Sequence, residues 1–144
     1  MRRFSSLPSK PIKKPIIVVI GAGWAGFRLA NDLDKKKFDV HVVSPRNHFL
    51  FTPLLPSASV GTLEFRAIQE PVRTIPGIKY EQAFVDHINF KEKILDCKDA
   101  FKNGHCFSLP YDALVLAVGS ETATFGVKGL QNNENVFFLR QVSN

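Results

Sequence analysis

Three glycines with the spacing of a phosphate-binding turn stand near the start of the sequence. Gly21, Gly23 and Gly26 directly follow 16–20, a run of five β-branched residues. In such a G-x-G-x-x-G turn the first glycine makes the bend, the second lets a pyrophosphate approach the backbone, and the third allows close helix–strand packing. The phosphates then face the free N–H groups of the helix start. The sequence therefore predicts dinucleotide binding; glycines that serve only a tight turn are the alternative, which this context disfavours.

The elements that would position this turn are predicted on both sides of it. Residues 16–20 are typical of a strand buried on both faces, residues 24–33 of a helix, and residues 38–43 alternate as a second strand. Further along we expect a helix over 65–75 and strands over 79–85, 93–97, 106–109 and 113–118. The predicted fold class is α/β: a Rossmann-like domain with a mostly parallel sheet flanked by helices.

Other candidate binding residues follow the predicted strands. Ser44 stands where a Rossmann domain usually has an acidic residue for the ribose, which argues mildly against NAD but does not establish FAD. Arg46 could bond a phosphate or stack on adenine, or it could be a solvated surface charge. Val85 would flank the adenine by packing or through its backbone. Ala117 and Gly119 would let the last strand run close to the ligand, although any buried strand can end this way.

The longest specific signal is the string from Ser44 to Ser57, SPRNHFLFTPLLPS, continued by VGTLE at 60–64 and EPVR at 70–73. It resembles the N-terminal part of type II (alternative, rotenone-insensitive) NADH dehydrogenases, and the resemblance covers about residues 14–144. These proteins are flavoproteins with two dinucleotide-binding domains. Two positions depart from the family pattern: His48, where the family usually has tyrosine, and Lys128, where it commonly has proline.

The resemblance implies an FAD-binding half-domain whose chemistry is that of the flavin. Its family transfers hydride from NADH to FAD and then reduces a membrane quinone, so we assign no catalytic acid or base in this chain. Thr52 and Pro53 would approach the isoalloxazine ring. The residues expected to line the FAD are Gly21, Gly23, Trp24, Gly26, Ser44, Arg46, Thr52, Pro53, Val85, Ala117 and Gly119.

Family members are several times longer, with a second glycine motif for NADH, a quinone site and membrane-binding C-terminal helices. We therefore expect this chain to be inactive alone and to use NADH and quinone only with a complementary C-terminal part. A half-built domain would also expose strand edges and apolar surface. Two alternatives stay open: a shortened, non-catalytic structural subunit of a mitochondrial respiratory-chain complex, and a free-standing nucleotide-binding module.

Charge and composition divide the chain into a basic N-terminal tail, 1–14, and a domain, 15–144. The net charge of +6 includes five Lys and Arg residues of the tail, leaving about +1 (6 − 5) for the domain, so no nucleic-acid-binding face is predicted. The acid-free tail is interpreted as a mitochondrial targeting segment; the alternative is a disordered basic N-terminus with no targeting role. We expect peripheral association with the inner membrane and no membrane span.

Cys97 and Cys106 are expected to be buried core residues, and no metal site is predicted.

Overall fold

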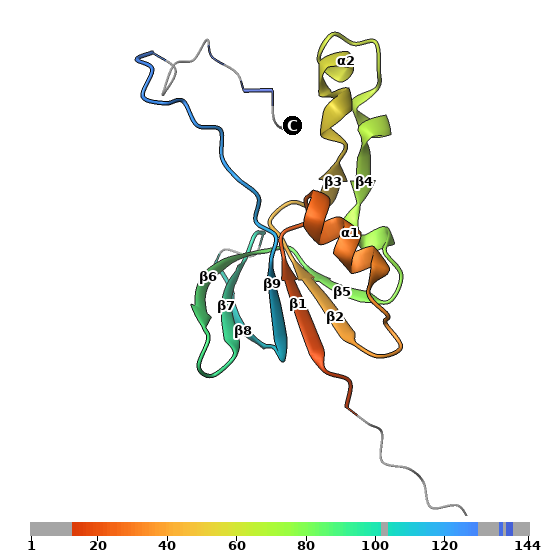
Figure 1. The fold of residues 1–144 in the computed structure, drawn as a ribbon, viewed down its shortest axis with the longest axis vertical. Helices are drawn as coiled ribbons and strands as arrows, with labels where there is room; N and C mark the ends of the chain where they lie inside the picture. The colour runs from red at the N-terminus through yellow and green to blue at the C-terminus, as the bar shows by residue number, and fades with distance from the viewer. Residues whose placement is uncertain (1–12, 102–103, 130–135, 137, 140–144) are drawn as a thin grey trace, which may run out of the picture.

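A four-stranded parallel sheet forms the centre of the molecule. The computed structural model describes residues 13–101, 104–129, 136, 138 and 139. The sheet has the order β5-β2-β1-β9, with β1 at Ile16–Ile20, β2 at Asp39–Val43, β5 at Ile78–Glu81 and β9 at Ala113–Leu116. Helix α1, Trp24–Asp32, connects β1 to β2, and it covers one face of the sheet (Figure 1). The predicted strand–helix–strand unit around the glycine turn is confirmed.

The β-branched run of β1 is buried on both faces, as predicted. Val19 packs with Phe27 and Ala30 of α1 on one face. Val18 and Ile20 point to the other face, where they join a separate core that includes Leu95. Alternating side chains of one strand therefore hold together two layers, which explains why no polar residue interrupts the run.

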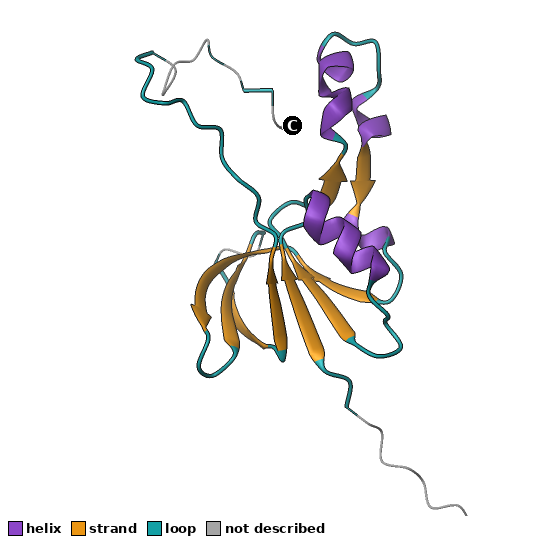
Figure 2. Cartoon of the chain, in the orientation of Figure 1, coloured by secondary structure: helices purple, strands orange, loops and turns teal. Residues whose placement is uncertain are grey.

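The layer opposite α1 is a second sheet. It is a three-stranded antiparallel meander with the order β6-β7-β8, formed by Ala83–Asn89, Ile94–Asp99 and Cys106–Pro110. Figure 2 shows it beside the parallel sheet. Leu95 and Cys97 of β7 pack against Val18 and Val43 of the parallel sheet. The core thus has helix on one side of the parallel sheet and antiparallel strands on the other.

Residues 48–71 form an arm that projects from the sheets (Figure 2). Strands β3, His48–Leu50, and β4, Gln69–Pro71, pair antiparallel at its base. Its outer part holds the 3₁₀ helices η1, Thr52–Leu54, and η2, Phe65–Ile68, and helix α2, Leu55–Ser59. A small core inside the arm is made by Leu50, Leu55 and Ile68. Residues 48–71 are therefore an ordered structure with its own core.

Two predicted elements are wrong. The segment expected as one helix over 65–75 consists of η2, β4 and a third 3₁₀ helix, η3, Val72–Thr74. Its buried residues Ile68, Val72 and Ile75 have helical spacing, but Ile68 belongs to the core of the arm and the other two to the core under α1. The strand expected over 79–85 is divided at Gln82 between the two sheets.

The remaining expectations have mixed outcomes. Cys97 is buried, but Cys106 is exposed, so the expectation of a core role is wrong for the latter. β9 lies at an edge of the parallel sheet and has no fully buried residue; Leu116 at its end is 57% exposed and Val118, beyond it, is 67% exposed. No helix in the described part of the chain is long and apolar enough to cross a membrane. Most of the predicted tail, residues 1–12, lies outside the described residues.

Truncation of Leu95 tests the packing of the two sheets. Its side chain is fully buried between them, so Leu95→Ala removes packing that nothing nearby replaces. We expect a loss of about 3 kcal/mol in the free energy of unfolding, measured by denaturant unfolding of the purified chain. Val60→Ala, at an exposed position on the arm, is the control and should change it by less than about 0.5 kcal/mol.

Candidate dinucleotide-binding site

A cavity of about 1000 Å³ opens at the carboxyl ends of β1, β2 and β9. Its volume is at the upper end of the range usual for small-molecule sites. This edge of a parallel sheet is where ligands bind in open α/β folds. The glycine turn forms one wall, residues 43–46 a second, the continuation of β9 a third, and strand β6 a fourth.

Two glycines hold the start of α1 against the end of β1. Gly21 has a φ of +103°, which favours glycine, and its N–H donates a hydrogen bond to the Val43 carbonyl at 2.8 Å. A Cβ on Gly26 would overlap the Gly21 carbonyl, and one on Gly21 would overlap the carbonyl of Ala117. Any side chain at either position would push these three segments apart.

Gly23 differs from both neighbours because the space beside it is open. Its φ of −80° suits any residue, and a Cβ built there meets no atom within 4 Å. It is the N-cap of α1, has no side-chain capping bond, and is followed by a first turn without acidic residues. Gly23, Trp24 and Ala25 line the cavity, and their N–H groups, at the positive end of the helix dipole, have no acceptor within the helix. This arrangement fits a pyrophosphate.

The chain after β2 is held in place from β5 and the residue that follows it. The Tyr80 hydroxyl donates to the carbonyls of Ser44 and Arg46, both at 3.1 Å, and Gln82 Nε2 donates to the Pro45 carbonyl at 2.9 Å. Burial raises the pKa of Tyr80 to about 12, although Arg73 acts against it, so this hydroxyl keeps its proton at neutral pH. The buried Ser44 Oγ accepts from the Arg46 N–H at 3.2 Å.

Aromatic contacts join the arm to the glycine turn. Trp24 Nε1 donates to Thr52 Oγ1 at 3.1 Å. The Trp24 ring meets Phe49 edge-on, with 4.9 Å between centroids, and Phe27 stacks on Phe49 at 4.8 Å. Such pairs contribute about 0.5–1.5 kcal/mol each beyond the area they bury. They fix η1, which carries Thr52, at the mouth of the cavity.

Comparisons with known proteins agree with this geometry. The family model described as pyridine nucleotide-disulphide oxidoreductase matches residues 15–144. The chain belongs to this family. It is 46% identical to a "Probable NADH dehydrogenase" of Dictyostelium discoideum, over 92% of this chain and 30% of that protein. It is 43% identical to a mitochondrial internal alternative NAD(P)H-ubiquinone oxidoreductase A1 of Solanum tuberosum, over 93% and 29%.

The fold comparison leads to the same group. The structure of NDH2 from Plasmodium falciparum in complex with NADH matches with a TM-score of 0.77 and 35% identity, over 83% of this chain and 25% of that one. The resemblance to the N-terminal part of type II NADH dehydrogenases is thereby confirmed. The chain spans about 30% of the length of the curated relatives it matches.

Nine of the eleven residues predicted to line the dinucleotide surround this cavity. Gly26 and Pro53 are not among the lining residues: Gly26 lies behind the cavity wall against Gly21, and Pro53 is an exposed residue of η1. The nine predicted residues thus come together from five separate segments of the chain. Their contact with a cofactor stays a prediction.

Apart from Val85, the part of the cavity formed by β6 was missed by the sequence analysis. It contributes Phe84, Asp86 and His87 of β6, and Phe90 directly after the strand. The pairing of β6 with β7 shifts register between Val85 and His87, and no glycine or proline marks this irregularity in the sequence. His48, noted from the sequence only as a departure from the family pattern, also lines the cavity.

The environment of His48 generates a testable prediction. Burial, and then the positive charge of Arg46, lower the pKa of His48 from its ordinary value of 6.5. Arg46→Gln should therefore raise the pKa of His48 in an NMR titration of its ring, without restoring 6.5, because the burial remains. Arg28→Gln, which removes an arginine from α1, is the control and should leave the titration unchanged.

The same pKa difference links His48 to stability. Because the pKa is lower in the folded state, the unfolded chain binds the proton first as the pH falls. The contribution of His48 to the free energy of unfolding is therefore complete above about pH 6.5 and decreases as the pH falls below it. A His48→Gln variant should lack this dependence, and an unchanged pH profile in that variant would contradict the assignment.

Proposed function

We propose that this chain binds FAD and forms the FAD-binding N-terminal part of a non-proton-pumping NADH:quinone oxidoreductase. The observation that carries the proposal is the open space beside Gly23. Gly23 is the N-cap of α1 at the cavity, and because it has no side chain, a pyrophosphate can approach the helix start. Nine residues predicted for FAD surround the same cavity. The names of the relatives, which include NADH dehydrogenase and NAD(P)H-ubiquinone oxidoreductase, support the proposed activity.

Each part of the cavity has a role in this proposal. The pyrophosphate would lie at Gly23 against the first N–H groups of α1. Ser44 and Arg46 would hold the ribose and adenine end together with Val85, and Thr52 and Pro53 would lie near the isoalloxazine ring. Bound FAD would supply the redox chemistry, accepting hydride and passing on two electrons. The side chains of this chain would position the cofactor, and none is assigned a proton-transfer role.

The complete activity needs more binding sites than the described residues provide. Hydride transfer requires NADH beside FAD, and among the described residues only the turn at 21–26 forms a glycine cradle at a helix start. We therefore propose that NADH and quinone bind with the participation of a complementary C-terminal part. Mitochondrial names among the relatives support a location at the mitochondrial inner membrane, with residues 1–14 as a targeting segment.

Substitution of Gly23 separates cofactor binding from folding. Gly23→Ala places a methyl group in the open cradle, where it meets no protein atom but would displace a pyrophosphate. We expect unchanged thermal unfolding of the apoprotein and at least about tenfold weaker FAD binding, a difference of about 1.4 kcal/mol, measured by quenching of flavin fluorescence. Gly61→Asn adds a side chain to an exposed glycine of the arm, outside the cavity, and should leave FAD binding unchanged.

Gly26→Ala gives the contrasting result, because its methyl group overlaps the Gly21 carbonyl. It should lower the unfolding temperature of the apoprotein, as expected for overpacking of about 1–3 kcal/mol. If the wild-type chain took up no FAD, or if Gly23→Ala bound it as tightly as the wild type, the cofactor assignment would be wrong.

The proposed division of the activity has its own test. The 144-residue chain loaded with FAD should not oxidise NADH in the presence of a soluble quinone, followed by absorbance of NADH. Addition of the C-terminal part of a related oxidoreductase, as a separate chain, is expected to restore oxidation. Steady-state turnover by the 144-residue chain alone would contradict the need for a complementary part.

A further inference from the structure

A second cavity, of about 550 Å³, lies at the base of the arm. His48 lines both this cavity and the dinucleotide cavity, so the two are separated by the chain that enters β3. We call the second cavity the arm groove. The residues that line it come from the arm, from η3 and from the two sheets: Asn47, His48, Arg66, Gln69, Pro71, Arg73, Gln82 and Phe101.

The positive charge in the arm groove comes from two arginines. Each guanidinium group lies over an aromatic ring and, among the described residues, is not paired with a carboxylate. The Arg66 guanidinium lies over the Phe65 ring at 5.8 Å, and the Arg73 guanidinium lies over the Tyr80 ring at 5.7 Å. Within the described part of the chain, neither forms an ion pair with an acidic side chain. Their N–H donors are thus oriented but available to an anion.

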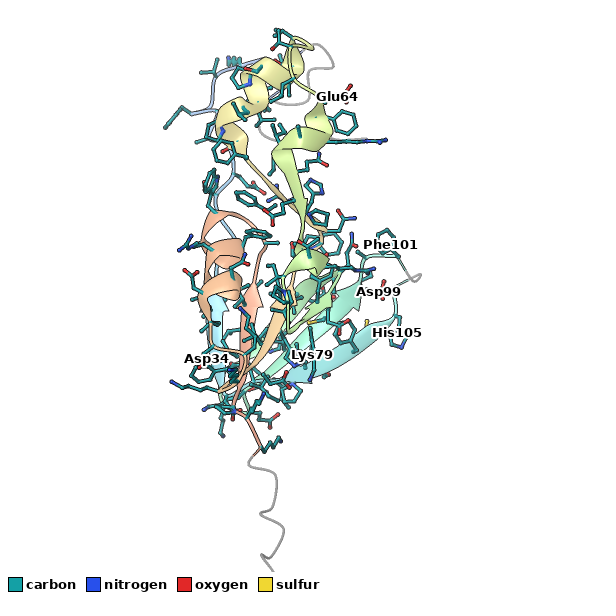
Figure 3. All side chains as sticks on the ribbon, turned by 90° about the vertical axis from the view of Figure 1, so that its right-hand side faces the viewer. Asp34, Glu64, Lys79, Asp99, Phe101 and His105 are labelled. Carbon is teal, nitrogen blue, oxygen red and sulfur yellow. The ribbon has the colours of Figure 1, made fainter. Side chains whose placement is uncertain are left out.

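Strand geometry keeps acidic side chains out of the arm groove. His48 pairs with Pro71, and Phe49 pairs with Glu70. Because neighbouring residues of a strand point to opposite faces, Glu70 lies on the side of Phe49, away from the groove. Asp99, on β7, is near Phe101 in Figure 3, but its Oδ1 accepts the Phe101 N–H at 2.7 Å and it does not line the groove. Among the described residues, every charged side chain that lines the groove is therefore cationic.

The remaining lining groups suit a planar, polar ring. Phe101 is 71% exposed and lies on the turn after β7, at the level where the arm meets the sheets (Figure 3). Asn47, Gln69 and Gln82 bring amide groups to the same groove. Asn47 Oδ1 lies 2.8 Å from His48 Nδ1, and Gln82 Nε2 donates to the Pro45 carbonyl, so the other amide atoms are the ones offered to a base edge. Every base has a flat face that stacks on an aromatic side chain, so Phe101 offers a surface for such a ring.

From these features we infer that the arm groove binds a nucleoside monophosphate, with its phosphate at Arg66 and Arg73 and its base against Phe101. The ligand is a second nucleotide, separate from the dinucleotide of the main cavity. The site does not depend on the proposed function, because none of its arginines lines the main cavity. Since His48 borders both cavities, occupation of the groove would also contact a wall of the main cavity.

Calorimetric titration of the full chain with adenosine 5′-monophosphate tests this inference. Arg66→Gln and Arg73→Gln should each weaken binding at least tenfold, because each removes charge-assisted hydrogen bonds to the phosphate. Arg28→Gln removes an exposed arginine of α1 and should leave binding unchanged. Arg46→Gln discriminates between the two cavities, because Arg46 lines the main cavity and not the groove. Binding that survives Arg46→Gln and is lost in the groove variants supports the inference.

Two further probes identify the part of the ligand that is recognised. Adenosine should bind at least tenfold more weakly than the monophosphate, and Phe101→Ala should weaken binding of the monophosphate but not of inorganic phosphate. If binding of the monophosphate were lost in Arg46→Gln and unaffected in Arg66→Gln and Arg73→Gln, the ligand would lie in the main cavity and the inference would be wrong. Inorganic phosphate that binds as tightly as the nucleotide would overturn the nucleotide assignment.

Discussion

The close contact between Gly26 and the Gly21 carbonyl is the constraint on which the site depends. It brings the first turn of α1 against the end of β1, where a methyl group would already overlap the backbone. The Gly21 N–H bonds the end of β2, and the Ala117 N–H bonds the Ile20 carbonyl at 2.8 Å. One packing contact therefore aligns the helix start with the ends of three strands, and the phosphate cradle at Gly23 follows from that alignment.

The second contribution to the site comes from the arm. A short two-stranded pair with a small core would be marginally stable alone, but Phe49 of this arm packs on Trp24 and Phe27 of α1. The arm thus becomes an extension of the glycine turn and carries Thr52 to the cavity. The same anchoring forms the arm groove on the face of the β3–β4 pair opposite Phe49. This strand pair therefore borders two cavities that have different lining residues.

The antiparallel sheet determines the depth of the main cavity. It covers the face of the parallel sheet opposite α1, and β6 extends to the cavity with side chains of both polar and aromatic type. The carboxyl edge of the parallel sheet alone would be a shallow ligand site. With β6 as a wall, it becomes large enough for an extended ligand such as a dinucleotide.

The local sequence determined the strand–turn–helix–strand unit, because its signals are local: a β-branched run, glycines at fixed spacing, and a helix-forming segment. It also determined seven of the nine predicted residues around the cavity, since residues that follow the carboxyl ends of parallel strands must meet at one edge. The other two, Thr52 and Val85, lie on the arm and on antiparallel β6. Tertiary structure decided the remainder. Ile68, Val72 and Ile75 have the spacing of a buried helix face, but they are buried in two different cores. The change of sheet at Gln82 and the register shift in β6 depend on strand partners that are distant in the sequence. Periodicity records whether a side chain is buried and cannot record which distant segment buries it.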